Sequence, residues 1–126
     1  MMRFTLLANV FAIVRLAPDS RIPAWATGGT FYSLTQTAEE LSIVCVQSHV
    51  PADTEKAERD WRCMKLEGQI PFGVTGVVAG LSKPLADAGI GIFIVSTYDT
   101  DYLLVKSADL TRALATLRAA GYEVAE

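Results

Sequence analysis

Two β-rich runs joined by a short polar segment restrict the fold of this chain more than any other feature. The runs are Gly91–Thr97 and Tyr102–Lys106, and the residues Tyr98–Asp101 between them have the length of a hairpin loop. Runs rich in β-branched and aromatic residues at this spacing pair antiparallel. The sequence therefore predicts a β-hairpin, and the elements on either side of it decide the fold.

A helical pattern precedes the hairpin. Its apolar residues recur at helical spacing, at Val77, Val78, Leu81, Leu85 and Ala88. Pro84 leaves two possibilities open: a kinked helix that begins just after Gly76, or a shorter helix capped by Ser82 with the proline in its first turn. Gly89 suits the left-handed position that ends either helix.

A second helical pattern follows the hairpin. Ser107 is a candidate N-cap, with Asp109 in the first turn and Gly121 as the end of the helix. One apolar stripe runs along it, formed by Leu110, Ala113, Leu114 and Leu117. With Phe72–Gly76 as a first strand and Tyr122–Ala125 as a last one, residues from about 70 onward predict β-α-β-β-α-β, the ferredoxin-like arrangement of two helices on one face of an antiparallel sheet.

The first half of the chain predicts strands and little helix. Expected strands lie at Phe31–Thr35 and Leu41–Val46, and Phe4–Leu16 is expected to be a buried strand pair. Thr37–Glu40 has capping-box spacing but leaves room for only one turn. The charged residues 51–60 predict an exposed, potentially helical connection, so we place the boundary between two units there, at 1–60 and 61–126.

Composition limits the function classes. A content of 51% hydrophobic and 20% charged residues is typical of a well-packed globular protein. The net charge of −3 and the scattered basic residues argue against a nucleic-acid partner. The apolar stretch near the N-terminus is too short to span a bilayer and lacks a cleavage site. Two cysteines without a CxxC pair indicate neither a zinc site nor a disulfide framework, and favour a cytoplasmic location.

Several segments resemble the ACT-domain proteins of the CASTOR-like group. They are Phe31–Thr35, Glu39–Cys45, Trp61–Gly68, Gly76–Ala79, Lys83–Gly89, Ile94–Asp101 and Leu104–Lys106, and together they span essentially the whole chain. The resemblance implies an α+β protein of two ferredoxin-like ACT units side by side, the first reduced in helix content, with an amino acid held in the crevice between them. Members studied in animals sense arginine.

The resemblance also implies a set of ligand-binding residues. In the first unit these are Ser42 and Ile43. In the second unit they are Gly76, Ala79, Ser82, Thr97, Tyr98 and Asp101.

The chemistry of these positions suits an α-amino acid, although each residue also has a structural interpretation. Gly76 before a helix allows close backbone approach to a carboxylate, or simply makes a turn. Asp101 can accept hydrogen bonds from an ammonium group, or form the turn. Tyr98 can cover a ligand or pack at the sheet edge. The peptide groups at Ser42 and Ile43 can bind a ligand or join the neighbouring strand, and the Ile43 side chain is typical of a core.

An enzyme needs a nucleophile and a base, and the sequence offers weak candidates. The histidine His49 has no motif around it and is expected to be structural or solvated. Cys45 is expected in the core, while Cys63 could be exposed but shows no sign of activation. Asp99 and Asp101 are a carboxylate pair without a third ligand for magnesium. We therefore expect no catalytic residue, no metal and no cofactor.

The leading hypothesis is a regulatory or sensor module that binds an amino acid or similar small metabolite, and that forms a homodimer through free sheet edges. The alternative is a constitutive protein–protein interaction or structural module without a tight ligand. The two differ in whether polar groups converge on a ligand-sized cavity. A transferase acting on small metabolites has less support, because no acid–base pair stands at recognisable spacing.

Overall fold

The computed structural model describes residues 2–126, and these divide into two compact units. One unit contains Asn9–Trp61, and the other contains Arg62–Glu126 together with the chain up to Ala8. The predicted division at residue 60 did not anticipate that the first residues belong with the C-terminal part. We call the two parts the N-terminal and the C-terminal unit. Among residues 2–126 no helix is long and apolar enough to cross a membrane.

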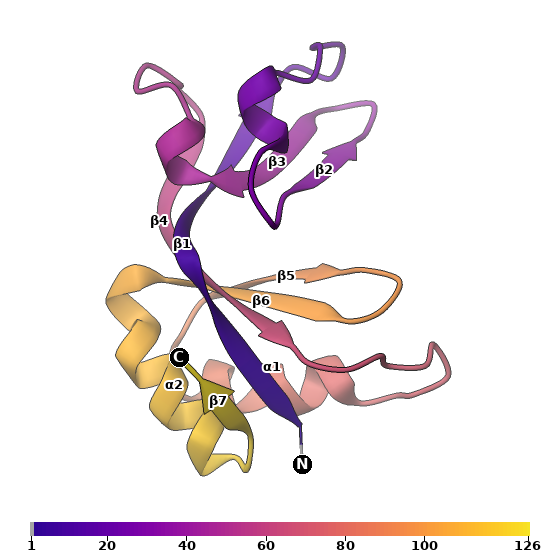
Figure 1. The fold of residues 1–126 in the computed structure, drawn as a ribbon, viewed down its shortest axis with the longest axis vertical. Helices are drawn as coiled ribbons and strands as arrows, with labels where there is room; N and C mark the ends of the chain where they lie inside the picture. Colours follow the sequence, from indigo (N-terminus) through magenta and orange to yellow (C-terminus); the bar gives the residue numbers. More distant parts are fainter. Residues whose placement is uncertain (1) are drawn as a thin grey trace. The chain divides into compact units, whose positions relative to one another are not determined.

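Two long strands contribute to both units. They are β1 (Arg3–Leu16) and β4 (Ala57–Leu66), drawn in indigo and magenta-pink in Figure 1. The predicted strand pair at 4–16 is thus one strand, because no residue in this stretch forces a turn. Residues 57–60 begin β4, so the predicted exposed connection ends earlier than expected. The first residues of β4 alternate between half-buried and exposed positions, which is typical of a strand with one solvated face.

The C-terminal unit has the predicted α+β content. Its strands follow the order β7-β1-β4-β6-β5, with β5 (Ile92–Ser96) and β6 (Asp101–Lys106) as the predicted antiparallel hairpin and β7 (Glu123–Ala125) at the other edge. The first strand of the β-α-β-β-α-β series is β4 and not Phe72–Gly76. That run forms no strand because it is exposed, with Phe72 at 75% relative exposure. β7 pairs parallel with β1, so one strand pair departs from the antiparallel expectation.

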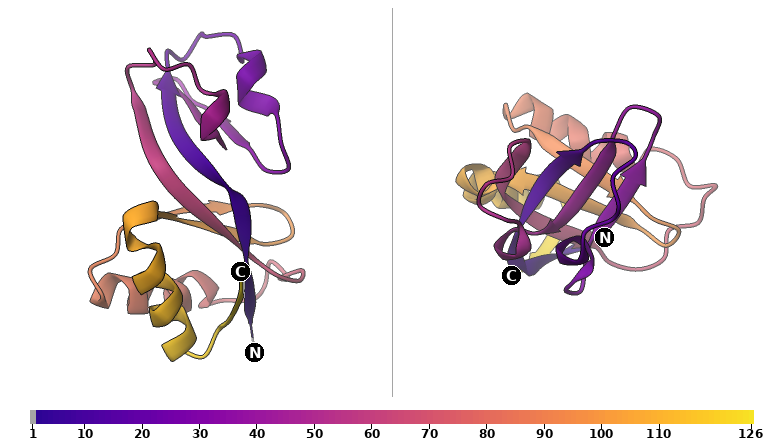
Figure 2. Two further views of the ribbon diagram at one scale, coloured as in Figure 1. Left: turned by 60° about the vertical axis from the view of Figure 1, so that its left-hand side comes forward. Right: turned by 90° about the horizontal axis from the view of Figure 1, so that it is seen from above.

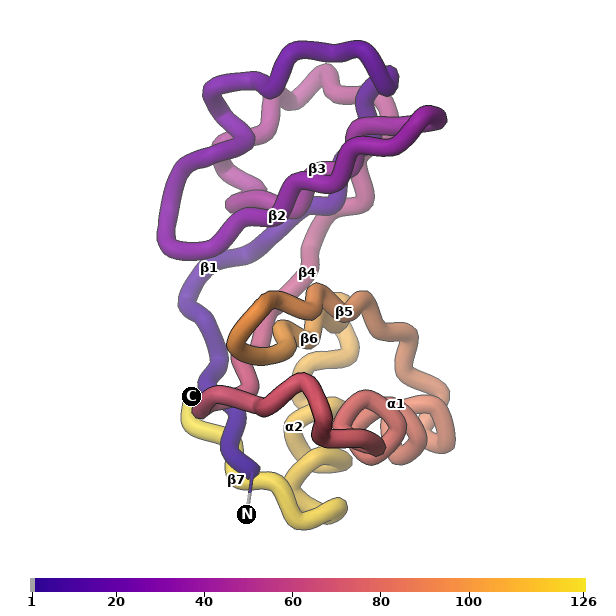
Figure 3. The backbone as a smooth tube through the Cα atoms, turned by 90° about the vertical axis from the view of Figure 1, so that its right-hand side faces the viewer, coloured from indigo at the N-terminus to yellow at the C-terminus, as the bar shows by residue number. Residues whose placement is uncertain are grey.

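Helices α1 (Val77–Asp87) and α2 (Leu110–Ala119) lie side by side on one face of the C-terminal sheet, as Figures 2 and 3 show. α1 begins directly after Gly76 and contains Pro84, which decides between the two predicted starts. Ser107 does not cap α2. Residues Ser107–Asp109 form a 3₁₀ turn before it. Strands and helices together bury one core, which includes Phe4, Met64, Leu66, Leu81, Leu85, Leu103, Val105, Leu114 and Leu117.

Both helices end as the sequence predicts. Gly89 and Gly121 have φ values of +74° and +98°. At α1 the N–H of Ile90 donates to the Leu85 carbonyl, and at α2 the N–H of Tyr122 donates to the Leu117 carbonyl. These bonds are those of the Schellman motif, in which a left-handed residue without a Cβ lets the chain turn back.

The N-terminal unit is built mainly from strands. Its order is β2-β3-β1-β4, where β2 is Ser33–Gln36 and β3 is Leu41–Val46. Two short 3₁₀ turns, Ala24–Thr27 and Gln47–His49, complete its regular structure. Thr37–Glu40 forms the turn between β2 and β3, where the Thr37 hydroxyl accepts from the N–H groups of Glu39 and Glu40. It is the turn of a hairpin and not the single helical turn that the capping-box spacing allowed.

Candidate functional site

The loop between β5 and β6 is a four-residue turn closed by hydrogen bonds. The N–H of Thr97 donates to the Thr100 carbonyl at 2.8 Å, and the Thr97 hydroxyl also bonds to Thr100. The buried Thr100 hydroxyl donates to the Leu66 carbonyl of β4 at 2.6 Å. The hairpin tip is therefore fixed both within itself and to the neighbouring strand.

Asp101 begins β6 directly after this turn. Asp101 was predicted to be the last residue of the loop, but it belongs to the strand. It is only 9% exposed. Ser96 is its antiparallel partner across the hairpin and donates its hydroxyl to Asp101 Oδ1 at 2.6 Å. Among the described residues no lysine or arginine pairs with Asp101, and its Oδ2 has no hydrogen-bond partner. A largely buried carboxylate in this state can accept from a cationic group of a ligand.

The start of helix α1 supplies hydrogen-bond donors, whereas Asp101 supplies an acceptor. Gly76 precedes it with φ +80° and ψ 0°, and no side chain caps the helix. The first helical bond runs from the Gly80 N–H to the Gly76 carbonyl at 2.8 Å. The N–H groups of Val77, Val78 and Ala79 consequently have no acceptor within the helix, and they carry the partial positive charge that attracts an anion.

The segment between β4 and α1 is attached to the hairpin tip through Asp99. The N–H of Ile70 donates to the Asp99 carbonyl at 2.8 Å, and Gln69 Nε2 donates to Asp99 Oδ1 at 3.3 Å. This attachment brings Phe72 against Tyr98, with ring centroids 4.9 Å apart at an interplanar angle of 79°. Both rings are exposed, at 75% and 80%.

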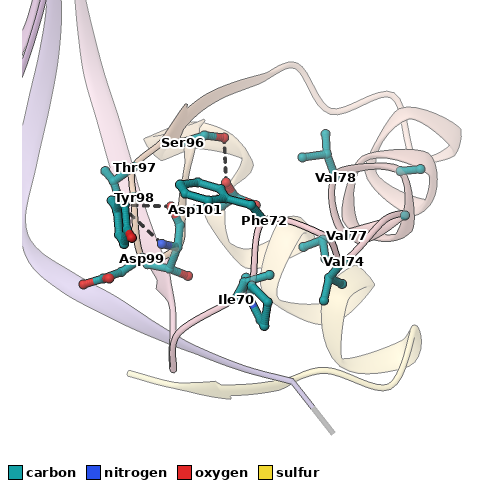
Figure 4. A pocket seen from close by; sticks show the side chains of 14 residues that line it. Ile70, Phe72, Val74, Val77, Val78, Ser96, Thr97, Tyr98, Asp99 and Asp101 are labelled. Carbon is teal, nitrogen blue, oxygen red and sulfur yellow. Dashed lines mark hydrogen bonds between the residues drawn. The ribbon is translucent and has the colours of Figure 1, made fainter.

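These three elements line an open cavity of about 330 Å³ in the C-terminal unit. Figure 4 shows the hairpin residues on one side of it, the first residues of α1 on the other, and Phe72 between them on the side of Tyr98. The cavity is lined by Ile70, Pro71, Phe72, Val74, Gly76, Val77, Val78, Ala79, Ser96, Thr97, Tyr98, Asp99, Thr100 and Asp101. It joins a carboxylate, unpaired backbone N–H groups and apolar side chains within a ligand-sized space.

Five of the predicted ligand residues line this cavity: Gly76, Ala79, Thr97, Tyr98 and Asp101. Ser82 lies on α1, outside the lining. Ser42 and Ile43 lie in β3 of the N-terminal unit, and this strand pairs with β1 on one side and β2 on the other. Ile43 is fully buried in the core of its own unit. The ligand-binding roles of all eight residues stay predictions.

Sequence reasoning missed Ser96 and the segment from Ile70 to Val74. Ser96 had a usable signal, because it ends the strand opposite Asp101 in the predicted hairpin. Phe72 and Val74 were predicted to lie in the first strand of the C-terminal unit. Their position at the cavity depends on the bond between Ile70 and Asp99, which joins residues distant in the chain.

The remaining reactive side chains lie elsewhere. Cys45 and Cys63 are fully buried free thiols, so the expectation that Cys63 could be exposed is wrong. Burial raises the pKa of Cys45 to about 11 and that of Cys63 to about 12. His49 was expected to be either structural or solvated, and it is exposed in a 3₁₀ turn. Among residues 2–126 no three His, Cys, Asp or Glu side chains gather to hold a metal ion.

Comparison with known protein families identifies both parts of the chain. A family model described as ACT domain matches residues 56–119, just over half of the chain. A second model, for an N-terminal domain, matches residues 9–53.

Three individual proteins are informative. The human protein CASTOR3P is 30% identical over 99 residues, which cover 69% of this chain and 61% of that protein. The rat cytosolic arginine sensor for mTORC1 subunit 1 is 30% identical over 96 residues, covering 69% of this chain and 29% of the sensor. The chain thus spans only part of these curated relatives. The crystal structure of an Agrobacterium tumefaciens protein superposes with a TM-score of 0.91 at 42% identity, covering 98% of this chain and 91% of that one.

Proposed function

The chain belongs to the ACT domain family, and on this basis we propose that it is a regulatory module that binds an amino acid in the cavity of its C-terminal unit. The rat relative is named as an arginine sensor, which supports a role in sensing small molecules. A cytoplasmic location, consistent with that relative's name, is part of the same proposal.

One observation carries the proposal. The cavity holds Asp101, which is 9% exposed and has no cationic partner, together with a helix start whose first N–H groups lack acceptors. An α-amino acid supplies the ammonium group that Asp101 needs and the carboxylate that the N–H groups of Val77, Val78 and Ala79 attract. Charge-assisted hydrogen bonds of this kind contribute about 1.5–3 kcal/mol each.

The remaining cavity residues position or cover the ligand. Ser96 holds the Asp101 carboxylate in place through its hydroxyl. Tyr98 and Phe72, in edge contact with each other, can close over a bound molecule. Roles for Ser42, Ile43 and Ser82 stay predictions, as does a homodimer, which light scattering of the purified protein would test.

A constitutive interaction module is the second candidate. The observation that favours it is the exposure of four apolar or aromatic side chains around the same cavity, namely Phe72, Val74, Val78 and Tyr98. Exposed apolar groups of this kind often mark protein contacts. This alternative predicts no stabilisation by free amino acids.

Thermal unfolding of the full chain in the presence of each of the twenty amino acids separates the two. A ligand at about 100 times its dissociation constant adds about 2.7 kcal/mol, which raises Tm by on the order of 10 °C in a chain of this size. The shift should disappear in Asp101→Asn and persist in Asp53→Asn, whose exposed carboxylate lies outside the cavity. Absence of any shift at millimolar concentrations would contradict amino-acid binding.

A further inference from the structure

The side-chain end of the cavity is almost entirely apolar. Eight of its lining residues come from the loop and from the first turn of α1. The five of them with the larger non-proline side chains are all aliphatic or aromatic: Ile70, Phe72, Val74, Val77 and Val78. The polar groups gather elsewhere, on the hairpin and along the backbone at the helix start. If the main chain of an amino acid uses these polar groups, its side chain faces the apolar ones.

The lining lacks a partner for an acidic side chain. None of its fourteen residues, all of them described, is a lysine, an arginine or a histidine. A second carboxylate placed near Asp101 would meet like charge without compensation. Aspartate, glutamate and phosphorylated amino acids are therefore disfavoured.

A basic side chain would need a second acidic group besides Asp101. The remaining carboxylate in the lining is Asp99, which is exposed and already accepts from Gln69 Nε2 at 3.3 Å. An ion pair in such a solvated position contributes little. If Asp101 holds the ligand's ammonium group, a guanidinium or a second ammonium gains little from this cavity.

We infer that the amino acid taken by this cavity carries an apolar side chain of the size of valine, leucine or phenylalanine. The inference rests on the proposed function and specifies its ligand class. A volume of about 330 Å³ is at the small end of ligand pockets, which suits a single amino acid. Because each methylene in an apolar pocket changes affinity by roughly 10–200-fold, leucine should bind at least about tenfold more tightly than alanine.

Calorimetric titration of the full chain with leucine, phenylalanine, alanine, arginine and glutamate tests the inference. We expect leucine or phenylalanine to bind most tightly and glutamate not to saturate. Phe72→Ala should weaken leucine binding by about tenfold or more. Ile22→Ala is the matched control, because Ile22 is also exposed but does not line the cavity.

The outcomes separate this inference from the proposed function. Tighter binding of arginine or alanine than of leucine, with loss in Asp101→Asn, would overturn the apolar class while amino-acid binding stands. Leucine binding that Phe72→Ala and Val74→Ser both leave unchanged would also overturn it. Failure of all five amino acids to bind would overturn both.

Discussion

Replacement of Thr100 by valine tests how the hairpin tip is held in place. Valine keeps the shape of the side chain but removes the hydroxyl, which is buried and donates to the Leu66 carbonyl at 2.6 Å. Loss of one net hydrogen bond costs about 0.5–1.5 kcal/mol, and a buried acceptor left without its donor raises the cost to about 1–3 kcal/mol. At roughly 3–6 °C per kcal/mol for a chain of this size, this cost of about 1–3 kcal/mol should lower Tm by about 3–18 °C.

Urea unfolding followed by circular dichroism measures the free energy directly. The control is Thr111→Val, which makes the same chemical change at an exposed position on α2 and should alter stability by less than about 0.5 kcal/mol. Equal unfolding free energies for the two variants, with unchanged m-values, would refute the assigned role of the Thr100 hydroxyl.

Two further predictions concern backbone and thiols. Gly76→Ala should destabilise the chain by about 1–2 kcal/mol in thermal unfolding, because φ is +80° and no atom lies within 4 Å of the added Cβ, so the cost is conformational. Gly91→Ala, at a position with equal space and no positive φ, should stay within about 0.5 kcal/mol, and equal effects would contradict the argument. Cys45 and Cys63 should react with a thiol reagent only on unfolding. Because folding raises their pKa values to about 11 and 12, the unfolded state ionises first, and stability should fall as pH rises from about 9. Stability that does not change between pH 9 and 11 would argue against their burial.

The C-terminal half of the fold could be predicted because its signals are local. The hairpin turn and both helix ends depend on residues within a few positions of each other, such as Ile90 with Leu85 and Tyr122 with Leu117. Strand β4 was missed because its partner is distant: the Glu67 N–H donates to the Arg3 carbonyl. No short-range pattern encodes such a pairing, and the charged start of the strand looks like a loop.

The candidate site was predictable only in part, for the same physical reason. Gly76 and Asp101 stand at element ends that the sequence marks, and family resemblance gave them a role. Ile70 and Phe72 reach the cavity through a backbone bond to Asp99, which forms only when the hairpin and the loop meet. The run that begins at Phe72 was predicted to be a strand, and only tertiary structure shows that Ile70 and Phe72 face a cavity.

The attachment of the loop to the hairpin tip suggests how a ligand could act on the rest of the unit. The Asp99 carbonyl accepts a hydrogen bond from the Ile70 N–H, and Phe72, two residues further on, places its ring beside Tyr98. A molecule bound to Asp101 and to the start of α1 would bridge the hairpin, to which Ile70 is attached, and the end of the loop at Gly76, so it would favour loop conformations in which Phe72 covers the cavity. A ligand shifts a conformational equilibrium only by its difference in affinity between the two states. An apolar side chain against Phe72 supplies such a difference, whereas a ligand that touched Asp101 alone would bind without changing the loop.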